Sequence, residues 1–274
     1  MSQPKKDPGM NRPLLLRVVP ERVQMSLYYR YYRSKRQDWL QLYTAAPLKY
    51  VSGVKMDLIP GDGVSDSIAF TGLYEPHLTR RLVELGRQGG RLIDIGANIG
   101  YFSLLWCACN PQNECIAFEA SPRNVDLLRR NISQSGLEER IIVMPLAAGA
   151  SKGRIQFDVG PADQTGWGGM TLKKTDRSIE VEVVRVDEVV GSDKPVQALK
   201  VDIEGADTWA LIGCERLLKA NVIRQIWYEQ NKPRMRELGI SFEAAQDYLR
   251  SLGYKSRPLN DPKDDLVEWF ATPM

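Results

Sequence analysis

The chain has 274 residues, 43% of them hydrophobic and 26% charged, which is ordinary for a globular protein of one large domain or two small ones. Its net charge of +3 divides into +8 on residues 1–55 and −5 on the remainder. A basic N-terminal extension and an acidic body are therefore expected to have different roles. No apolar run approaches the roughly 18 residues of a membrane span, and residues 14–16 are too short for a signal-peptide core, which excludes membrane-spanning and secreted classes.

Residues 1–66 are predicted to form a basic helical extension. Its first eleven residues are polar and are expected to be disordered. Between residues 21 and 43 the hydrophobic residues recur at helical spacing, which predicts a helical region. Short strands are predicted at 48–58 and 67–70, separated by the turn signal Pro60-Gly61-Asp62-Gly63.

Residues 67–274 are predicted to form one α/β domain, because apolar strands alternate with amphipathic helices. The predicted helices begin at Pro76 and at residues 101, 122, 206 and 241. The predicted strands cover 91–95, 115–118, 141–145, 196–201, 222–228, 254–257 and 266–270. This order predicts a Rossmann-like, seven-stranded, mostly parallel sheet with an antiparallel final pair. Residues 153–186 alternate strictly around a glycine-rich loop, which predicts an antiparallel excursion set on the main sheet.

Residues 92–100, Leu-Ile-Asp-Ile-Gly-Ala-Asn-Ile-Gly, read as an apolar strand and a glycine turn that opens a helix. Gly96 and Gly100 are expected to let the backbone pass close to a ligand, where a Cβ would collide. Glu119 ends the next apolar run, about 20 residues on, where a carboxylate can accept hydrogen bonds from a ribose diol. Asn98 stands where a dinucleotide fingerprint has its second glycine. The pattern therefore favours S-adenosylmethionine, which carries an amino acid instead of phosphates.

Further cofactor contacts are expected around this turn. Asp94 is predicted to contact the methionine end of the cofactor through water or backbone. Asn98 either touches the ligand or holds the turn in a left-handed conformation. Tyr101 and Phe102 fit a cofactor wall and a hydrophobic core equally well. Open α/β sheets bind ligands at the carboxyl ends of their strands, which adds Ala147 and Asp202 to the cofactor-binding candidates.

The run Lys200-Val201-Asp202-Ile203-Glu204-Gly205 is the second main signal. Alternation along a strand puts Lys200 and Asp202 on one face. Asp202, Glu204 and Asp207 crowd carboxylates at the mouth of the sheet, and like charges held close can raise a pKa toward neutrality. Asp202 and Glu204 are therefore candidate catalytic residues. Mg²⁺ could instead neutralise the cluster, but we expect no metal, since no His or Cys joins the set.

Two candidates lie outside that run. His77, the only histidine, has an ordinary pKa that suits base catalysis, although a lone histidine at a helix start also fits a structural role. Trp167 lies in the glycine-rich loop, where it could close over an apolar acceptor as a lid or pack on the body of the protein.

Four stretches follow one another in a definite order and spacing: Gly72-Leu73-Tyr74-Glu75, 94–100, Ala117-Phe118-Glu119-Ala120-Ser121-Pro122-Arg123-Asn124, and Lys200-Val201-Asp202-Ile203-Glu204-Gly205-Ala206-Asp207. In these the chain resembles the FkbM family of S-adenosylmethionine-dependent methyltransferases, over roughly residues 67–230. Two residues depart from the family pattern. Ala120 replaces a common proline, and Asp207 stands where glutamate is usual, which shortens that side chain by one methylene.

The resemblance implies a class I methyltransferase fold, S-adenosylmethionine as the cofactor, and methyl transfer to a hydroxyl of a sugar or secondary metabolite. It implies that Glu75 lines the cleft or binds the acceptor, and it adds Glu75 to the catalytic candidates. It also places Ala120 and Ser121 beside Glu119 at the cofactor. The identity of the acceptor stays open, because members of the family differ widely in what they modify.

Three other functions compete with this reading: an NAD-dependent oxidoreductase, a nucleic-acid-directed module, and a non-catalytic module that uses the basic N-terminal segment. The missing second glycine and the motif at residues 200–205 weigh against the oxidoreductase. The acidic body and the lack of an N-P-P-Y-like motif weigh against a nucleic-acid substrate, and the intact set of cofactor residues weighs against a non-catalytic module. We expect a small-molecule hydroxyl acceptor, no nucleic acid and no membrane contact, and leave a homo-oligomer open. The four cysteines form no C-x-x-C pair and fall in apolar segments, as expected of reduced thiols in a cytoplasmic protein.

Overall fold

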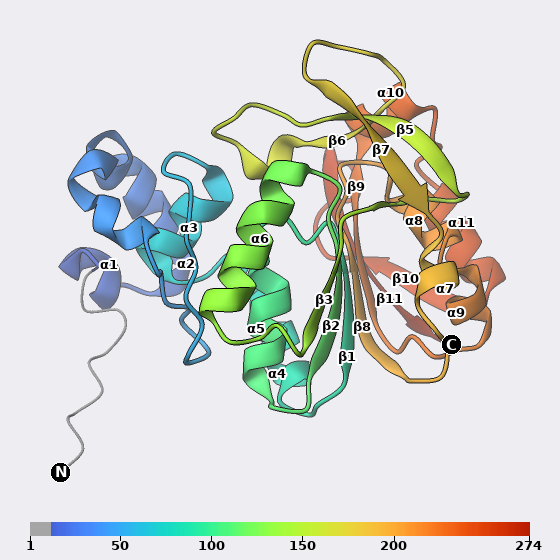
Figure 1. Ribbon diagram of the computed structural model, residues 1–274, viewed down its shortest axis with the longest axis horizontal. Coiled ribbons are helices and arrows are strands. Elements are labelled where there is room, and N and C mark those ends of the chain that lie inside the picture. Colours follow the sequence, from blue (N-terminus) through green and yellow to red (C-terminus); the bar gives the residue numbers. More distant parts are fainter. Residues whose placement is uncertain (1–11) are drawn as a thin grey trace.

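The computed structural model describes residues 12–274, and its centre is a seven-stranded sheet with the order β10-β11-β9-β8-β1-β2-β3 (Figure 1). Strands β9, β8, β1, β2 and β3 run parallel, whereas β11 pairs antiparallel with both β9 and β10. The bounds are β1 (Arg91–Ile95), β2 (Glu114–Phe118), β3 (Ile141–Met144), β8 (Val196–Val201), β9 (Ile226–Asn231), β10 (Tyr254–Pro258) and β11 (Leu266–Pro273). The predicted α/β sheet with its antiparallel final pair is confirmed.

Helices cover both faces of this sheet (Figure 1). One face carries α4 (Pro76–Gly86), α5 (Tyr101–Cys109) and α6 (Pro122–Gln134). The other carries α7 (Val186–Val189), α8 (Asp207–Ile212), α9 (Glu215–Lys219) and α11 (Ala244–Ser251). Each face of the sheet packs on its own hydrophobic core, and alternate residues of a strand point to opposite cores. Leu92 belongs to the core under α4, α5 and α6, and Ile93 and Ile95 belong to the core on the other face. A sheet buried on both faces explains why its central strands read as continuous apolar runs.

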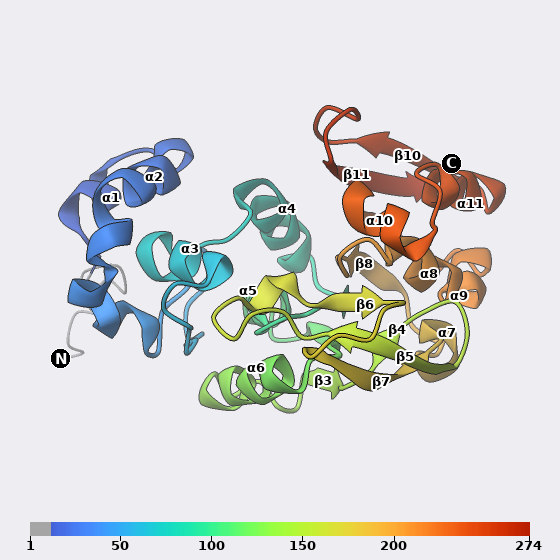
Figure 2. The same ribbon diagram turned by 90° about the horizontal axis from the view of Figure 1, so that it is seen from above.

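A second sheet of four strands, in the order β4-β7-β5-β6, lies between β3 and β8 in the chain (Figure 2). Within it β5 (Gly153–Asp158) pairs antiparallel with β6 (Gly169–Thr171) and with β7 (Ser178–Val184), as predicted for residues 153–186. The short β4 (Ala147–Ala148) runs parallel to β7. These strands form a sheet of their own, and they pack with α10 (Lys232–Leu238), a helix that the sequence did not predict.

The N-terminal region is helical, as predicted, but in four short segments. They are α1 (Leu14–Val18), α2 (Glu21–Leu27), the π-helix η1 (Tyr28–Tyr32) and the 3₁₀ helix η2 (Arg33–Tyr43). The buried carboxylate of Asp66 accepts hydrogen bonds from the hydroxyls of Tyr28 and Tyr43, each at 2.5 Å. These bonds fasten η1 and η2 to the helix that carries Asp66.

The two strands predicted for residues 48–58 and 67–70 are wrong. The second lies inside α3 (Gly63–Thr71), whose first turn is capped by the Asp62 side chain accepting from the backbone N–H of Ser65. From residue 65 to its end α3 is buried, so its apolar run shows no amphipathic period that would distinguish a helix from a strand. Residues 48–58 contribute only an isolated bridge.

Other boundaries differ by small amounts. The helix predicted near residues 206–219 is two helices, α8 and α9, with a break at Gly213. The domain boundary after residue 66 stays a prediction, and α3 spans that position. The disorder expected for residues 1–11 lies outside the described residues. No helix between residues 12 and 274 is long and apolar enough to cross a membrane. All four cysteines are free, and three are buried.

Candidate active site

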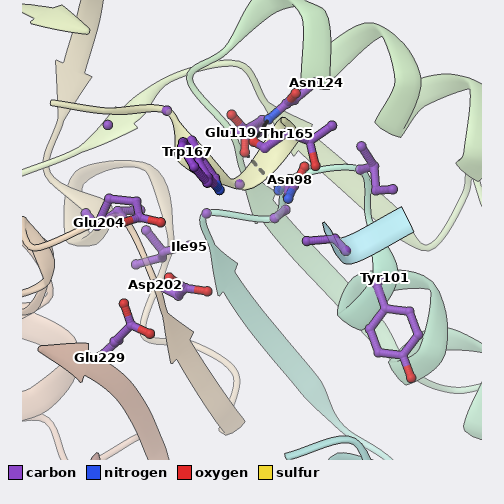
Figure 3. A pocket seen from close by; sticks show the side chains of 18 of the residues that line it. Ile95, Asn98, Tyr101, Glu119, Asn124, Thr165, Trp167, Asp202, Glu204 and Glu229 are labelled. Carbon is purple, nitrogen blue, oxygen red and sulfur yellow. Dashed lines mark hydrogen bonds between the residues drawn. The ribbon is translucent and has the colours of Figure 1, made fainter. Parts of the chain in front are cut away.

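A cavity of about 780 Å³ opens at the carboxyl ends of β1, β2, β8 and β9. Figure 3 shows two groups of polar side chains in it. We call the part around Asn98, Glu119, Asn124 and Thr165 the Glu119 end, and the part around Asp202, Glu204 and Glu229 the acidic end. The cavity brings together most of the predicted site residues: Glu75, Gly96, Asn98, Tyr101, Phe102, Glu119, Ala120, Ala147, Asp202 and Glu204.

The glycine turn after β1 packs tightly against the protein itself. Gly96 has a φ of +80°, and a Cβ on it would lie 1.9 Å from the carbonyl oxygen of Asp202. Gly100 has a φ of +95°, and a Cβ on it would lie 2.5 Å from Cδ1 of Leu128 in α6. Protein neighbours and backbone conformation therefore already require glycine at these two positions, and the close approach of a ligand there stays a prediction.

Glu119 lies buried at the end of β2 and joins two loops. Its Oε2 accepts the backbone N–H of Asn98 at 2.8 Å (Figure 3). Its Oε1 accepts the backbone N–H of Ser121 at 2.8 Å. Burial raises the pKa of Glu119, and the two N–H groups oppose that rise. Asn98 has a φ of +52°, which is the left-handed conformation predicted as one of its two alternatives. Each carboxylate oxygen has a second acceptor position for a ligand hydroxyl.

Three buried polar atoms of residues near Glu119 have no hydrogen-bond partner within the described chain. They are Oδ1 of Asn98, Oδ1 of Asn124 and Oγ of Ser121. Buried polar atoms in native proteins are nearly always paired, so the two amide oxygens, which belong to residues that line the cavity, call for a polar ligand. Hydroxyl groups would match them, because an amide oxygen can only accept a hydrogen bond.

The acidic end holds carboxyl groups whose pKa values are raised. Burial, and then the negative charge of Asp202, raise the pKa of Glu75 and of Glu204 each to about 7, and that of Glu229 to about 10. Nδ2 of Asn231 donates to Oε2 of Glu204 at 2.6 Å. A carboxyl group that titrates near pH 7 can exchange a proton at neutral pH, which is the property expected of this crowded cluster.

Lys200 lines the cavity with only 4% of its surface exposed. Its Nζ donates to the carbonyl oxygen of Gly96 at 2.9 Å, and lies 3.3 Å from Oδ2 of Asp202 and 3.7 Å from Oδ1 of Asp94. Burial disfavours the ammonium, but the carboxylates of Asp202 and Asp94 outweigh this and raise the pKa of Lys200 above its usual range. The sequence placed Lys200 on the face of Asp202 without assigning it to the site.

Two of the acidic residues occupy a strained backbone conformation. The φ angles are +41° at Glu75 and +56° at Glu204. Of the five non-glycine residues with positive φ between residues 12 and 274, these two and Asn98 line the cavity. Such conformations cost about 1–3 kcal/mol each and cluster at functional sites. The strained backbone conformations and the carboxyl groups with raised pKa values therefore indicate the same location for the functional site.

Four predicted site residues do not line the cavity. Asp94 is fully buried, and its Oδ2 accepts the hydroxyl of Ser103 at 2.6 Å. Gly100 and Ser121 are buried in the turns described above. His77 is exposed on α4, away from the cavity lining. Direct contact of these residues with a ligand stays a prediction. Within residues 12–274, no feature of the structure around His77 supports its predicted role as a base.

The aromatic candidates divide between core and cavity. Tyr101 is buried with its hydroxyl 3.0 Å from Oγ1 of Thr79, and Figure 3 shows its ring directed away from both polar groups. Phe102 lies under Nζ of Lys200, 5.7 Å from its ring centre. Trp167 is 62% exposed and lies between the two ends of the cavity (Figure 3). An exposed indole ring between the two ends of the cavity is placed where it can contact a bound molecule.

Asp207 has a structural place that the sequence did not predict. It is buried, with Oδ1 accepting the backbone N–H of Glu229 at 3.1 Å and Oδ2 that of Ile203 at 3.4 Å. It therefore connects β9 to the loop after β8. Within residues 12–274, no three His, Cys, Asp or Glu side chains are arranged to hold a metal ion.

Sheet order, glycine turn and buried acid together define a class I methyltransferase fold. The family model described as "Methyltransferase FkbM domain" matches residues 94–256. The chain therefore belongs to the FkbM methyltransferase family, and the family assigns S-adenosylmethionine as the cofactor.

Individual relatives are distant. The chain is 25% identical over 173 residues to "Methyltransferase sdnD" of Sordaria araneosa, covering 50% of this chain and 66% of that one. A crystal structure of methyltransferase FkbM from Methylobacillus flagellatus KT is 16% identical with a TM-score of 0.48, covering 78% of this chain and 56% of that one. An O-methyltransferase from Bacillus cereus in complex with SAH is 15% identical with a TM-score of 0.42, covering 73% and 81%. The chain thus spans about two thirds of the first and just over half of the second.

The residues of the cavity fit this cofactor. Its ribose hydroxyls can donate to Glu119 and to the unpartnered oxygens of Asn98 and Asn124. Among the described residues, six acidic and two basic side chains line the cavity, which favours a ligand that carries a positive sulfonium. Asn124 and Thr165 were not predicted, because only the folded chain brings α6 and the loop before β6 beside Glu119.

Replacing Glu119 by alanine should weaken the binding of S-adenosylhomocysteine about 10–100-fold, because ribose hydroxyls and two backbone N–H groups lose a charged acceptor. Isothermal titration calorimetry would measure this. Glu114→Ala, at the opposite end of the same strand, is the matched control and should bind normally. An affinity of Glu119→Ala within about twofold of wild type would reject the ribose role.

The buried acids also predict how stability depends on pH. The pKa of Glu229 rises from 4.5 to about 10, first through burial and then through Asp202. Above pH 4.5 the unfolded chain therefore loses a proton that the folded chain keeps, so stability falls as pH rises toward 10. Glu229→Gln, which stays neutral, should flatten this decline in urea unfolding between pH 5 and 9. Glu84→Gln, on an exposed glutamate, should keep the wild-type slope, and an equal slope in Glu229→Gln would contradict the prediction.

Proposed function

We propose that this protein methylates a hydroxyl oxygen of a small molecule, such as a sugar or secondary metabolite, with S-adenosylmethionine as methyl donor. The observation that carries the proposal is one cavity with two chemically distinct ends. The Glu119 end offers acceptors for a nucleoside, and the acidic end offers carboxyl groups whose pKa is raised to about 7. A hydroxyl acceptor needs such a group, because its proton must leave as the oxygen is methylated.

Bound S-adenosylmethionine supplies a methyl group that its sulfonium makes electrophilic. The protein has two tasks, to hold the acceptor oxygen in line with that methyl group and to take the hydroxyl proton. Asp202 is one candidate for the second task, since its side chain is 31% exposed in the cavity and Lys200 keeps it oriented. Glu75 and Glu204, whose pKa is raised to about 7, are the other candidates at the same end.

The size of the cavity supports a small acceptor. A volume of about 780 Å³ is in the range of pockets for cofactors and drug-sized molecules. Residues of the N-terminal helices, Met25 and Tyr29, complete its wall. We also propose a cytoplasmic location, supported by four cysteines that remain free thiols.

The test is methyl transfer from S-adenosylmethionine with a deuterated methyl group to a panel of host metabolites, followed by mass spectrometry and fragmentation. The expected result is a labelled product with the methyl group on oxygen, which is lost with Glu119→Ala. Label found on nitrogen or carbon would overturn O-methylation while keeping methyl transfer. Failure of the protein to bind S-adenosylhomocysteine in calorimetry would reject the function altogether.

A further inference from the structure

One segment of the second sheet closes the Glu119 end of the cavity. We call residues 159–168, which connect β5 to β6, the strap. Gln164, Thr165, Gly166 and Trp167 of the strap line the cavity. A Cβ on Gly166 would lie 3.8 Å from Nδ2 of Asn98, so the strap lies directly against the glycine turn.

Asp62 fastens the strap to the N-terminal part of the chain. This residue is 1% exposed, and its two carboxylate oxygens serve different partners. Oδ2 accepts the backbone N–H of Ser65 at 2.9 Å and its hydroxyl at 2.7 Å, which caps α3. Oδ1 accepts the backbone N–H of Thr165 at 2.8 Å and its hydroxyl at 3.1 Å. A helix cap needs only one oxygen, so the second oxygen is available for the strap.

Three further hydrogen bonds hold the same part of the strap, one of them from Nη2 of Arg123 in α6 to the carbonyl oxygen of Gln164 at 3.0 Å. Nε2 of Gln164 donates to the carbonyl oxygen of Gly61 at 3.0 Å, next to Asp62 in the chain. Nδ2 of Asn124 donates to the carbonyl oxygen of Thr165 at 2.9 Å, while its Oδ1 stays unpartnered within the described chain. Thr165 is thus where the N-terminal region, α6 and the second sheet meet, beside Glu119 (Figure 3).

We infer that Asp62 is a positioning residue that holds the strap closed over the nucleoside part of the bound cofactor. The inference rests on the proposed function. Release of the nucleoside past the strap requires the Asp62–Thr165 hydrogen bonds to break, so these bonds slow cofactor dissociation. The N-terminal region thereby acquires a role at the cofactor site, through a residue 103 positions away in the sequence from the strap.

Asp62→Ser separates the two tasks of Asp62. Serine is itself a good helix cap, so α3 keeps its N-terminal hydrogen bond, but its single short oxygen leaves Thr165 without an acceptor. The dissociation of S-adenosylhomocysteine, followed by stopped-flow fluorescence in a chase experiment, should be about tenfold faster in this variant. Ser65→Ala is the matched control: it removes a bond to Oδ2 of Asp62 and leaves both strap bonds intact, so dissociation should stay at the wild-type rate.

Hydrogen exchange of the cofactor-free protein gives a second readout that needs no ligand. Asp62→Ser should speed exchange in residues 160–168, and Ser65→Ala should not. If Asp62→Ser does not fold, Thr165→Val, which loses the hydroxyl bond, and Thr165→Ser, which retains it, test the same contact. Faster dissociation with valine and a wild-type rate with serine are then expected.

Two results would overturn the inference: unchanged dissociation in Asp62→Ser or Thr165→Val, or equal acceleration in Ser65→Ala, which would mean that the stability of α3 alone matters. Failure of the wild-type protein to bind S-adenosylhomocysteine is a distinct outcome, because it rejects the proposed function and the inference with it, while normal binding with an unaffected rate rejects only the inference.

Discussion

Replacing Lys200 by methionine should lower the free energy of unfolding by about 3–5 kcal/mol. Methionine keeps the length of the side chain but removes the charge that faces Asp94 at 3.7 Å and Asp202 at 3.3 Å. Asp94 is fully buried, so its carboxylate would remain in the protein interior with only the hydroxyl of Ser103 as partner. The carbonyl oxygen of Gly96 would also lose its hydrogen bond. Urea unfolding measures the change.

Lys194→Met is the matched control, because Nζ of Lys194 also pairs with a carboxylate, Glu114 at 3.0 Å, but its side chain is 53% exposed. Exposed ion pairs contribute about 0–1 kcal/mol, so this variant should be nearly as stable as wild type. Adding Asp94→Asn to Lys200→Met should recover part of the loss, since it removes the uncompensated charge. A Lys200→Met protein within about 1 kcal/mol of wild type would show that the buried pair is not needed for stability.

The sequence predicts the central sheet well because local and global signals agree there. Apolar runs such as 92–95 and 115–118 are short, are bounded by glycine or polar residues, and alternate with amphipathic helices, and only a doubly wound sheet satisfies all of these. The prediction fails at residues 67–70, where α3 is buried on every side and loses the period of an amphipathic helix. Burial by the N-terminal helices, which decides that element, is a tertiary property.

The site divides in the same way. Glu119 and Asp202 could be predicted because each follows a strand whose position in the sheet is set by local pattern. The pairing of Asp62 with Thr165 could not be predicted, since the two residues are 103 positions apart in the sequence. One is the N-cap of α3, and the other lies in the strap. At Gly96 and Gly100 the fold shows a requirement for glycine that the sequence could not, because the neighbours that exclude a Cβ belong to the loop after β8 and to α6, far away in the chain.

Asp202→Asn should lower turnover about 10²–10⁴-fold while changing the affinity for S-adenosylhomocysteine little, if Asp202 takes or orients the acceptor proton. The side chain faces the cavity at the end of β8, and its contact with Lys200 fixes its direction. Asparagine keeps that shape but cannot accept a proton. Turnover with the acceptor identified by labelled methyl transfer, together with calorimetry, measures the two effects. Asp247→Asn, exposed on α11, should be normal in both.

The pH profile of this variant distinguishes the candidate bases. After burial, the negative charge of Asp202 is the main cause that raises the pKa of Glu75 and of Glu204 to about 7. Neutralising Asp202 therefore lowers both pKa values. If Glu75 or Glu204 is the base, the variant should stay active and the rise of its rate with pH should move to lower pH. If Asp202 is the base, the rate should be low at every pH from 5 to 9, and a normal rate at any of these values would exclude Asp202.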